Sequence, residues 1–257
     1  MNNHAKSCVL SSRCKVANSA KCNGQCPHWI SLHGASGSGG RSAATGLPKE
    51  YRLVTLESSP VATEQPKIYE TLAKYITTFE RQFEDGDDNR IKSLYLYSES
   101  PGTGKTTTAS ALINEYLIAN YIGSLKRGRQ ADQRAAYFLD VNAFQTDYNL
   151  ATMTNDESAM NEIKATIKRT QLSPFAVLDD IGVRSASEAF RSYVHAIINY
   201  RTTNGLPTVF TSNLPIEEMK TVFDARLYDR MRDQCLTLEF GGESHRGVRK
   251  QDQRGLR

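Results

Sequence analysis

The stretch that decides the fold is SESPGTGKTTT, at residues 98–108. A β-rich apolar run at 91–97 precedes it, and apolar residues at helical steps follow it at 109–117. The order of strand, glycine-rich loop and helix is the context of a phosphate-binding loop. Gly102 and Gly104 let successive N–H groups face a polyphosphate at the positive end of a helix dipole. The stretch therefore predicts a nucleotide site.

In a loop of this kind Lys105 contacts the β- and γ-phosphates, and the Thr106 hydroxyl binds Mg²⁺. The consensus G-x-x-x-x-G-K-[ST] has glycine where this chain has Glu99. The alternative is an ordinary strand–helix turn with an exposed lysine, and the flanking strand and helix favour the nucleotide site. The residues expected to bind the nucleotide are Pro101, Gly102, Thr103, Gly104, Lys105, Thr106, Thr107 and Asp179.

The composition allows a folded core, since 39% of the 257 residues are hydrophobic and 23% are charged. A net charge of +4 permits nucleic acid as a partner without requiring it. No apolar run approaches the length of a membrane span, and the N-terminus lacks a secretory apolar core. We therefore expect a cytoplasmic protein without a membrane partner.

Four of the five cysteines fall in the first 26 residues, with the spacing C-x5-C-x7-C-x3-C. In a reducing cytoplasm this clustering favours metal ligation over disulfides. We expect residues 1–33 to form a small module that folds around one tetrahedral Zn²⁺. An iron–sulfur cluster and a reactive or disordered tail are the alternatives. The expected ligands are Cys8, Cys14, Cys22 and Cys26, with His28 and His33 as bystanders or replacements for a cysteine.

Composition divides the rest of the chain into three parts. Residues 34–47 are rich in glycine and serine and predict a flexible linker. Residues 48–250 alternate apolar strands with amphipathic helices, and residues 251–257 form a basic tail. The alternation predicts an α/β domain with a parallel sheet covered by helices on both faces. The expected strands lie at 91–97, 136–141, 175–180, 207–213 and 236–240.

Polar side chains end two of the expected strands. Asp179 and Asp180 follow the buried run 175–178, at the sheet edge where open parallel sheets bind ligands. We expect Asp179 to hold Mg²⁺ through water and Asp180 to orient or deprotonate an attacking water. Asn213 ends the next strand and is expected to position that water or touch the γ-phosphate. A strand-end turn is the alternative at both places.

The C-terminal part is rich in arginine. An arginine can stabilise charge that develops on a transferred phosphoryl group, in cis or from a neighbouring subunit. The alternative is a solvated basic helix face, and spacing does not choose between them. The arginines concerned are Arg226, Arg230, Arg232, Arg246 and Arg249.

Four motifs occur in order: PGTGKT at 101–106, VLDDIG at 177–182, TSNLP at 211–215 and DRMR at 229–232. Together they resemble the AAA+ replicative helicase loaders of the DnaC/DnaI type, including phage-encoded versions. The resemblance covers about residues 50–250. It implies an AAA+ P-loop NTPase fold with a five-stranded parallel sheet.

The resemblance also implies roles for single residues. Asp180 stands where many AAA+ proteins have glutamate, and its shorter side chain predicts slow hydrolysis that suits a switch. Arg226 is a second candidate for the arginine finger. The matched residues are Lys105 and Thr106 (Walker A), Asp179 (Walker B, Mg²⁺), Asn213 (sensor 1), Arg230 (arginine finger in trans) and Arg246 (sensor 2).

By this resemblance the protein is an ATPase whose copies associate with ATP, bind single-stranded DNA and load the replicative helicase. The cysteine module stands where such loaders carry a helicase-binding module. The loop 126–134 and the tail 246–257 are candidates for DNA phosphate contacts, and Phe144 and Tyr148 for base stacking. The alternatives are a transposition ATPase subunit, a nucleotide-gated DNA-binding adaptor with little turnover and, ranked low, a nucleotide kinase.

Overall fold

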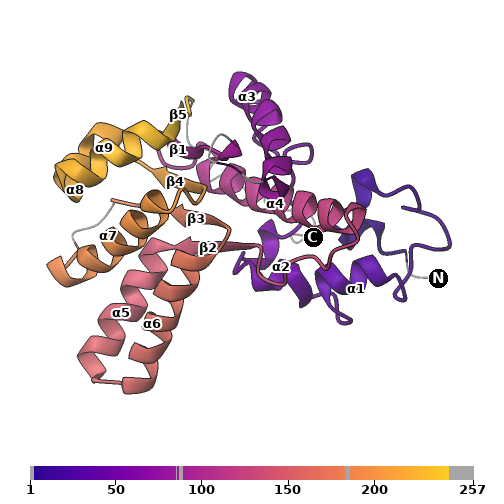
Figure 1. Ribbon diagram of the computed structural model, residues 1–257, viewed down its shortest axis with the longest axis horizontal. Helices are drawn as coiled ribbons and strands as arrows, with labels where there is room; N and C mark the ends of the chain where they lie inside the picture. The colour runs from indigo at the N-terminus through magenta and orange to yellow at the C-terminus, as the bar shows by residue number, and fades with distance from the viewer. Residues whose placement is uncertain (1–2, 85, 87–88, 183–185, 243–257) are drawn as a thin grey trace, which may run out of the picture.

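The structure is a computed structural model that describes residues 3–84, 86, 89–182 and 186–242 (Figure 1). Within these residues, five strands form one sheet in the order β2-β3-β4-β1-β5, and every neighbouring pair is parallel. This confirms the expected α/β fold and parallel sheet. The strands are β1 (Ser93–Tyr97), β2 (Ala136–Asp140), β3 (Phe175–Asp179), β4 (Thr208–Ser212) and β5 (Cys235–Glu239).

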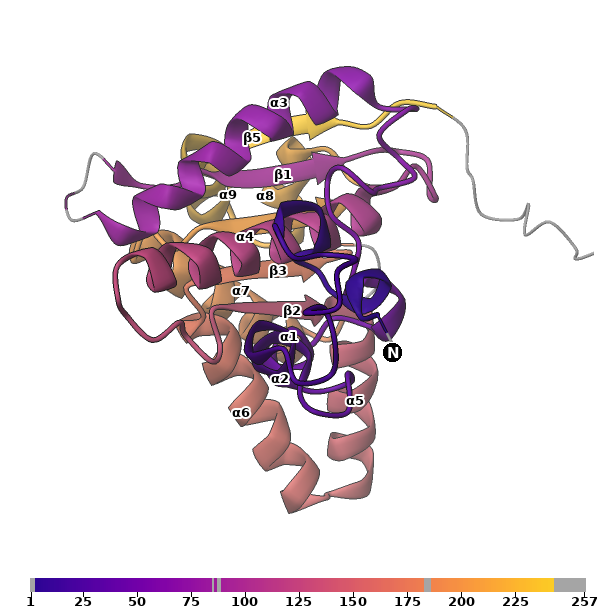
Figure 2. The same ribbon diagram turned by 90° about the vertical axis from the view of Figure 1, so that its right-hand side faces the viewer.

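Helices cover both faces of the sheet, because alternate strand residues point to opposite sides. Leu94 and Leu96 of β1 join a core with α3 and α4, whereas Tyr95 joins a second core with α7 and α9. α5 and α6 pair as a hairpin that extends away from the sheet (Figures 1 and 2). The helices of the domain are α3 (Pro66–Thr77), α4 (Lys105–Lys126), α5 (Val141–Thr154), α6 (Glu157–Leu172), α7 (Glu188–Thr203), α8 (Met219–Val222) and α9 (Ala225–Gln234).

Local sequence sets where several of these helices begin. Asp140, Asp156, Ser187 and Asp224 each accept a hydrogen bond from the backbone N–H three residues on, at the starts of α5, α6, α7 and α9. Such caps satisfy N–H groups that a helix leaves without a partner. Asp140 ends β2 as well as capping α5, so this junction turns directly from strand to helix.

The N-terminal segment packs against the domain through α1 (Pro27–His33) and α2 (Gly40–Ala44). The flexible linker expected at 34–47 is not what the structure contains. Arg41 is buried there, and its guanidinium donates to the backbone carbonyls of Ala131 at 2.9 Å and Asp132 at 3.0 Å. These long-range bonds order a segment whose composition predicts flexibility. The tail 251–257 lies outside the described residues.

None of the helices in the described ranges combines the length with the apolar character that crossing a bilayer requires.

Candidate functional site

The loop between β1 and α4 has the shape that its glycines predict. Gly102 and Gly104 have φ values of 79° and 96°, in the left-handed region that favours glycine. A Cβ on Gly104 would lie 2.5 Å from a methyl carbon of Val61, so the close approach of that side chain also requires glycine. α4 begins directly after Gly104, and the first N–H groups of a helix lack intrahelical acceptors. The junction therefore has the features of an anion site.

Glu99 occupies the position where the consensus has glycine, and its backbone explains why it is tolerated. Among the described non-glycine residues, positive φ values occur at Asn18, Asn155 and Asp180, so Glu99 lies outside the left-handed region. Its side chain is exposed. The first glycine of the consensus is therefore not required by the path of this loop.

Lys105 and Asn213, far apart in sequence, meet at the edge of the sheet. The Lys105 ammonium is buried and donates to Asn213 Oδ1 at 2.7 Å, and to the carbonyls of Ser98 and Ser100 at 3.3 and 3.2 Å. β4 is paired with β1, which brings its end to the phosphate loop. The structure thus joins two residues that the sequence assigns to one site.

Asp179 is the centre of a second set of contacts. Thr106 Oγ1 donates to its Oδ2 at 3.1 Å, and Thr211 Oγ1 donates to its Oδ1 at 2.7 Å. Burial raises the pKa of Asp179 to about 6, as do the carboxylates of Asp180 and Asp140, while the two threonine hydrogen bonds lower it. Both residues expected at the Mg²⁺ therefore lie in direct contact. A hydroxyl and carboxylates are the oxygen ligands that Mg²⁺ takes, so the donor set fits this ion.

Asp180 projects from a strained turn at the end of β3. Its φ is 64°, and its N–H donates to Thr211 Oγ1 at 2.8 Å. The Asn142 side-chain amide donates to the Asp180 carboxylate. Sequence reasoning missed Asn142, although its position just after β2 could have indicated it, because the ends of parallel strands share one edge. Asp180 is therefore oriented by two neighbouring elements.

These residues line one cavity of about 530 Å³. The segment before α3 forms its other wall, which the sequence did not predict. That volume is in the range of small-molecule sites, and the mixed apolar and acidic wall faces the phosphate loop. The cavity is lined by Pro48, Glu50, Tyr51, Pro60, Val61, Glu64, Pro101, Gly102, Gly104, Lys105, Thr106, Thr107, Phe138, Asp140, Asn142, Asp179, Asp180, Thr211 and Asn213. Thr103 of the predicted set is buried and does not line it.

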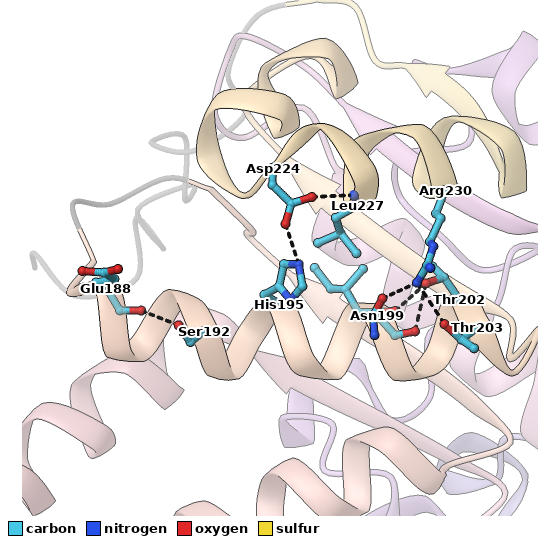
Figure 3. Close-up of polar contacts among 10 residues, drawn as sticks. Glu188, Ser192, His195, Asn199, Thr202, Thr203, Asp224, Leu227 and Arg230 are labelled. Carbon is cyan, nitrogen blue, oxygen red and sulfur yellow. Dashed lines mark hydrogen bonds and ion pairs between the residues drawn. The ribbon is translucent and has the colours of Figure 1, made fainter.

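The expected arginine finger lies on another face, where α9 packs along α7 (Figure 3). Arg230 donates to Asn199 Oδ1 and, at 3.1 Å, to Thr203 Oγ1. Asp224 fixes the start of α9 by accepting from the Leu227 N–H and from His195, both at 2.8 Å. Arg230 is absent from the residues that line the phosphate cavity. Arg246 and the tail 246–257 lie outside the described residues.

The aromatic residues expected to stack on DNA bases are part of the core. Phe144 and Tyr148 are 4% and 8% exposed, and both rings pack against Phe190. That prediction is wrong, because α5 turns its aromatic side toward α7. The loop 126–134 keeps exposed basic residues, among them Arg129 and Arg134, so its DNA contact stays a prediction.

The N-terminal cysteines share one cavity, but their geometry differs from the expected zinc site. Throughout 3–84 and the other described ranges, no three of the His, Cys, Asp or Glu side chains are grouped as one metal ion requires. The structure therefore does not support the predicted zinc site. His33 Nε2 accepts from the Val9 N–H at 3.1 Å, and His28 Nδ1 lies 3.0 Å from Tyr121 Oη, so both act as structural bystanders.

Comparisons with known proteins agree with this geometry. The profile of the family described as IstB-like ATP binding protein matches residues 90–253. Replicative helicase loader DnaC of Escherichia coli (strain K12) is 28% identical over 167 residues, and the match spans 65% of this chain and 61% of that protein.

Solved structures resemble the chain as well. A proposed primosome component from Streptococcus pyogenes serotype M3 has a TM-score of 0.54 and 25% identity, covering 80% of this chain and 97% of its own. The crystal structure of DnaI has a TM-score of 0.53 and 21% identity, covering 76% of this chain and 95% of its own. The second likeness shows a shared fold.

Proposed function

This chain belongs to the family of IstB-like ATP binding proteins, and on that premise we propose that it loads a replicative helicase onto single-stranded DNA under the control of ATP. The observation that carries the proposal is the single cavity that joins Lys105 and Asn213 with Thr106, Asp179 and Asp180. The relatives named as helicase loaders support a helicase as the partner that is loaded. The match spans 61% of the length of DnaC.

The residues of the cavity suit ATP with Mg²⁺. Lys105 and the first turn of α4 would bind the phosphates, and Thr106 with Asp179 would hold the ion. The bound ion supplies positive charge that offsets the charge developing on the phosphoryl group. Asp180, held by Asn142, would accept a proton from the attacking water. Its side chain is one carbon shorter than glutamate, which favours slow turnover.

The contact between Lys105 and Asn213 suggests how the cavity works as a switch. The ammonium has three protons and already donates to Asn213 and to two carbonyls of the loop. To bind phosphate oxygens it must give up part of this set. Since Asn213 leads into the segment before α8 and α9, a change at this bond is transmitted toward the helix that carries Arg230.

The decisive experiment is helicase loading onto closed circular single-stranded DNA. The protein, a cognate helicase and the circle are incubated with ATP, with a non-hydrolysable analogue or without nucleotide. We expect loading with ATP, a stalled ternary complex with the analogue, and neither without nucleotide. If no helicase is captured in any nucleotide state, the proposed function is wrong.

Arg230 is proposed to act on the ATP of a neighbouring copy, because it does not line its own cavity. Arg230→Ala should keep ATP affinity and reduce hydrolysis in the presence of helicase and DNA to the rate of the unassembled protein. Arg232→Ala is the matched control, since Arg232 lies on the same helix in an exposed pair with Asp229. Equal rates for the Arg230 and Arg232 variants would exclude the finger role.

A nucleotide-gated adaptor with little turnover is a second candidate, which the aspartate at 180 favours. ATP hydrolysis with and without single-stranded DNA, in the wild type and in Asp180→Ala, separates the two. DNA-stimulated hydrolysis that Asp180→Ala removes supports the loader, whereas no stimulation supports the adaptor.

A further inference from the structure

One hydroxyl near the end of β4 contacts both acids of the phosphate cavity. Thr211 is 1% exposed, and its Oγ1 donates to Asp179 Oδ1 at 2.7 Å. The same oxygen accepts from the Asp180 N–H at 2.8 Å. An ionised carboxylate can only accept and a backbone N–H can only donate, so the single proton of the hydroxyl is committed to Asp179. The direction of both hydrogen bonds is therefore fixed.

The Asp179 carboxylate depends on this hydroxyl for its orientation. It is 6% exposed, and its other oxygen accepts from Thr106 Oγ1 at 3.1 Å. Thr106 is itself expected at the Mg²⁺, so Thr211 is the hydroxyl donor to Asp179 that is not also an expected ligand. Hydrogen bonds of this kind, made to a metal-binding carboxylate by a residue outside the coordination sphere, hold the carboxylate in the orientation that binds the ion.

The turn that carries Asp180 depends on the same strand end. Its φ of 64° lies in the left-handed region, which residues other than glycine rarely adopt. Three hydrogen bonds to β4 hold the turn in place. The Asp180 N–H donates to Thr211 Oγ1, the Ile181 N–H donates to the Thr211 carbonyl at 2.9 Å, and Ser212 Oγ donates to the Ile181 carbonyl at 2.8 Å. Strained backbone of this kind persists where its surroundings hold it.

We propose that Thr211 is a positioning residue for ATP hydrolysis, whose hydroxyl orients Asp179 toward the metal ion and Asp180 toward the attacking water. Asn213, two residues further on, also lines the cavity and accepts from Lys105 at 2.7 Å. The end of β4 thus contacts the phosphate-binding lysine, the metal-binding carboxylate and the acid that faces the water. This inference rests on the proposed ATP site and does not depend on helicase loading.

Thr211→Val tests the role, because it removes the hydroxyl and keeps a branched side chain of similar shape. Asp179 would lose one of its two hydroxyl donors, and the Asp180 N–H would lose its acceptor. We expect the Mg²⁺ concentration that supports ATP binding to rise about 10- to 100-fold, and kcat to fall by a similar factor. ATP affinity in EDTA should stay unchanged, since Lys105 and its loop are intact.

Two further variants separate positioning from stability. Thr211→Ser keeps the hydroxyl and should recover most of the Mg²⁺ dependence and of kcat. Thr208→Val is the matched control, because Thr208 begins the same strand, is equally buried and accepts from Arg201 Nε at 2.8 Å, away from the cavity. It should lower thermal stability and leave the Mg²⁺ dependence, kcat and KM as in the wild type.

The measurements are ATP binding in EDTA and at increasing Mg²⁺, with steady-state hydrolysis for kcat and KM. A wild-type Mg²⁺ requirement in Thr211→Val, equal losses in Thr208→Val, or no recovery in Thr211→Ser would each overturn the positioning role. A wild type that binds no ATP would overturn both this inference and the proposed function. A wild type that shows the expected Mg²⁺ dependence but loads no helicase would contradict the proposed function alone.

Discussion

The two ends of α4 carry two kinds of site. At its N-terminal end, Lys105 and Thr106 are held by Asn213 and Asp179 through hydrogen bonds within the domain. At its C-terminal end, Tyr121 and Leu125 line a cavity together with four cysteines of the N-terminal segment. The first site is organised by the sheet edge, and the second by a few contacts that attach the segment to the helix. The difference teaches that ligand binding at the first end need not depend on order at the second.

Lys105→Ala should produce the largest effect, at the sheet-edge end. Removing the ammonium deletes its charge-assisted contacts to phosphate, each worth about 1.5–3 kcal/mol, so ATP affinity should fall roughly a hundredfold or more. Titration with a fluorescent ATP analogue measures this. Lys126→Ala, at the other end of the same helix, is the control and should leave ATP affinity unchanged. Unchanged affinity in Lys105→Ala would mean that the loop is not the phosphate site.

Much of the first site could be predicted because its signals are local. The strands appear in the sequence as short apolar runs. In the loop 98–108, Gly102 and Gly104 mark the positions where the backbone has a positive φ. Parallel strands then bring Asp179 and Asn213 to the edge that carries the loop. The sheet topology therefore follows from the alternation of apolar strands and amphipathic helices, which can be recognised in each segment separately.

The parts that were missed depend on contacts between distant residues. Arg41 orders the expected linker by donating to carbonyls about ninety positions away, which composition cannot indicate. Asn142 acts through Asp180, and the wall of 48–64 reaches the cavity by folding over α4. Phe144 and Tyr148 face the core because α5 packs on α7. The periodicity of α5 shows which side is apolar but does not show which helix covers that side.

The second end should be sensitive to acid. Burial lowers the pKa of His33 from 6.5 to about 4, and the neutral ring accepts a hydrogen bond from the Val9 N–H. The unfolded chain therefore binds the proton more readily, and stability is complete above pH 6.5 and falls as the pH drops toward 4. We expect a loss of about 2 kcal/mol between pH 7 and pH 5 from this group.

Urea unfolding at the two pH values measures the loss. His33→Asn removes the titration, so the difference between wild type and variant isolates the contribution of the histidine. The same pH dependence of stability in wild type and His33→Asn would contradict a contribution from His33. ATP affinity should change little over this range if the two ends are independent.

An ion pair joins the N-terminal segment to the middle of α4. Arg13 Nη2 lies 2.5 Å from Glu115, whose side chain is 2% exposed and also accepts from the Leu56 N–H. Arg13→Ala leaves this buried carboxylate with a weaker set of partners. Because Arg13 is itself 40% exposed, we expect a loss of about 1.5 kcal/mol, below the cost of breaking a fully buried pair.

Thermal unfolding measures the effect of Arg13→Ala, and Arg232→Ala serves as the exposed control. Arg232 and Asp229 lie 3.6 Å apart on the surface, so that substitution should cost less than about 0.5 kcal/mol. Equal losses in both variants would show that the Arg13 contact does not hold the segment. A fall in ATP affinity with Arg13→Ala would instead show that the two ends are coupled.

The smallest effect is expected for Glu99→Gly, which restores the consensus glycine. Glu99 is exposed, does not line the phosphate cavity and lies outside the left-handed region, so glycine is not needed to close the loop. The pKa of Tyr97 is raised by burial and by a hydrogen bond to Glu99, a contact on the strand side of the loop. Glycine adds freedom to the unfolded chain and should cost about 0.5 kcal/mol of stability.

ATP affinity in Glu99→Gly should stay within about threefold of wild type, a difference below roughly 0.7 kcal/mol. Glu99→Gln keeps the backbone and removes the charge, so the pair separates the two causes of any change. A tenfold gain in ATP affinity in both variants would mean that the Glu99 carboxylate repels the phosphates. Glu99 would then weaken ATP binding at the first end. A gain in Glu99→Gly alone would mean that the loop must move to bind, and the preformed geometry of Lys105 and Asp179 would be one of two states.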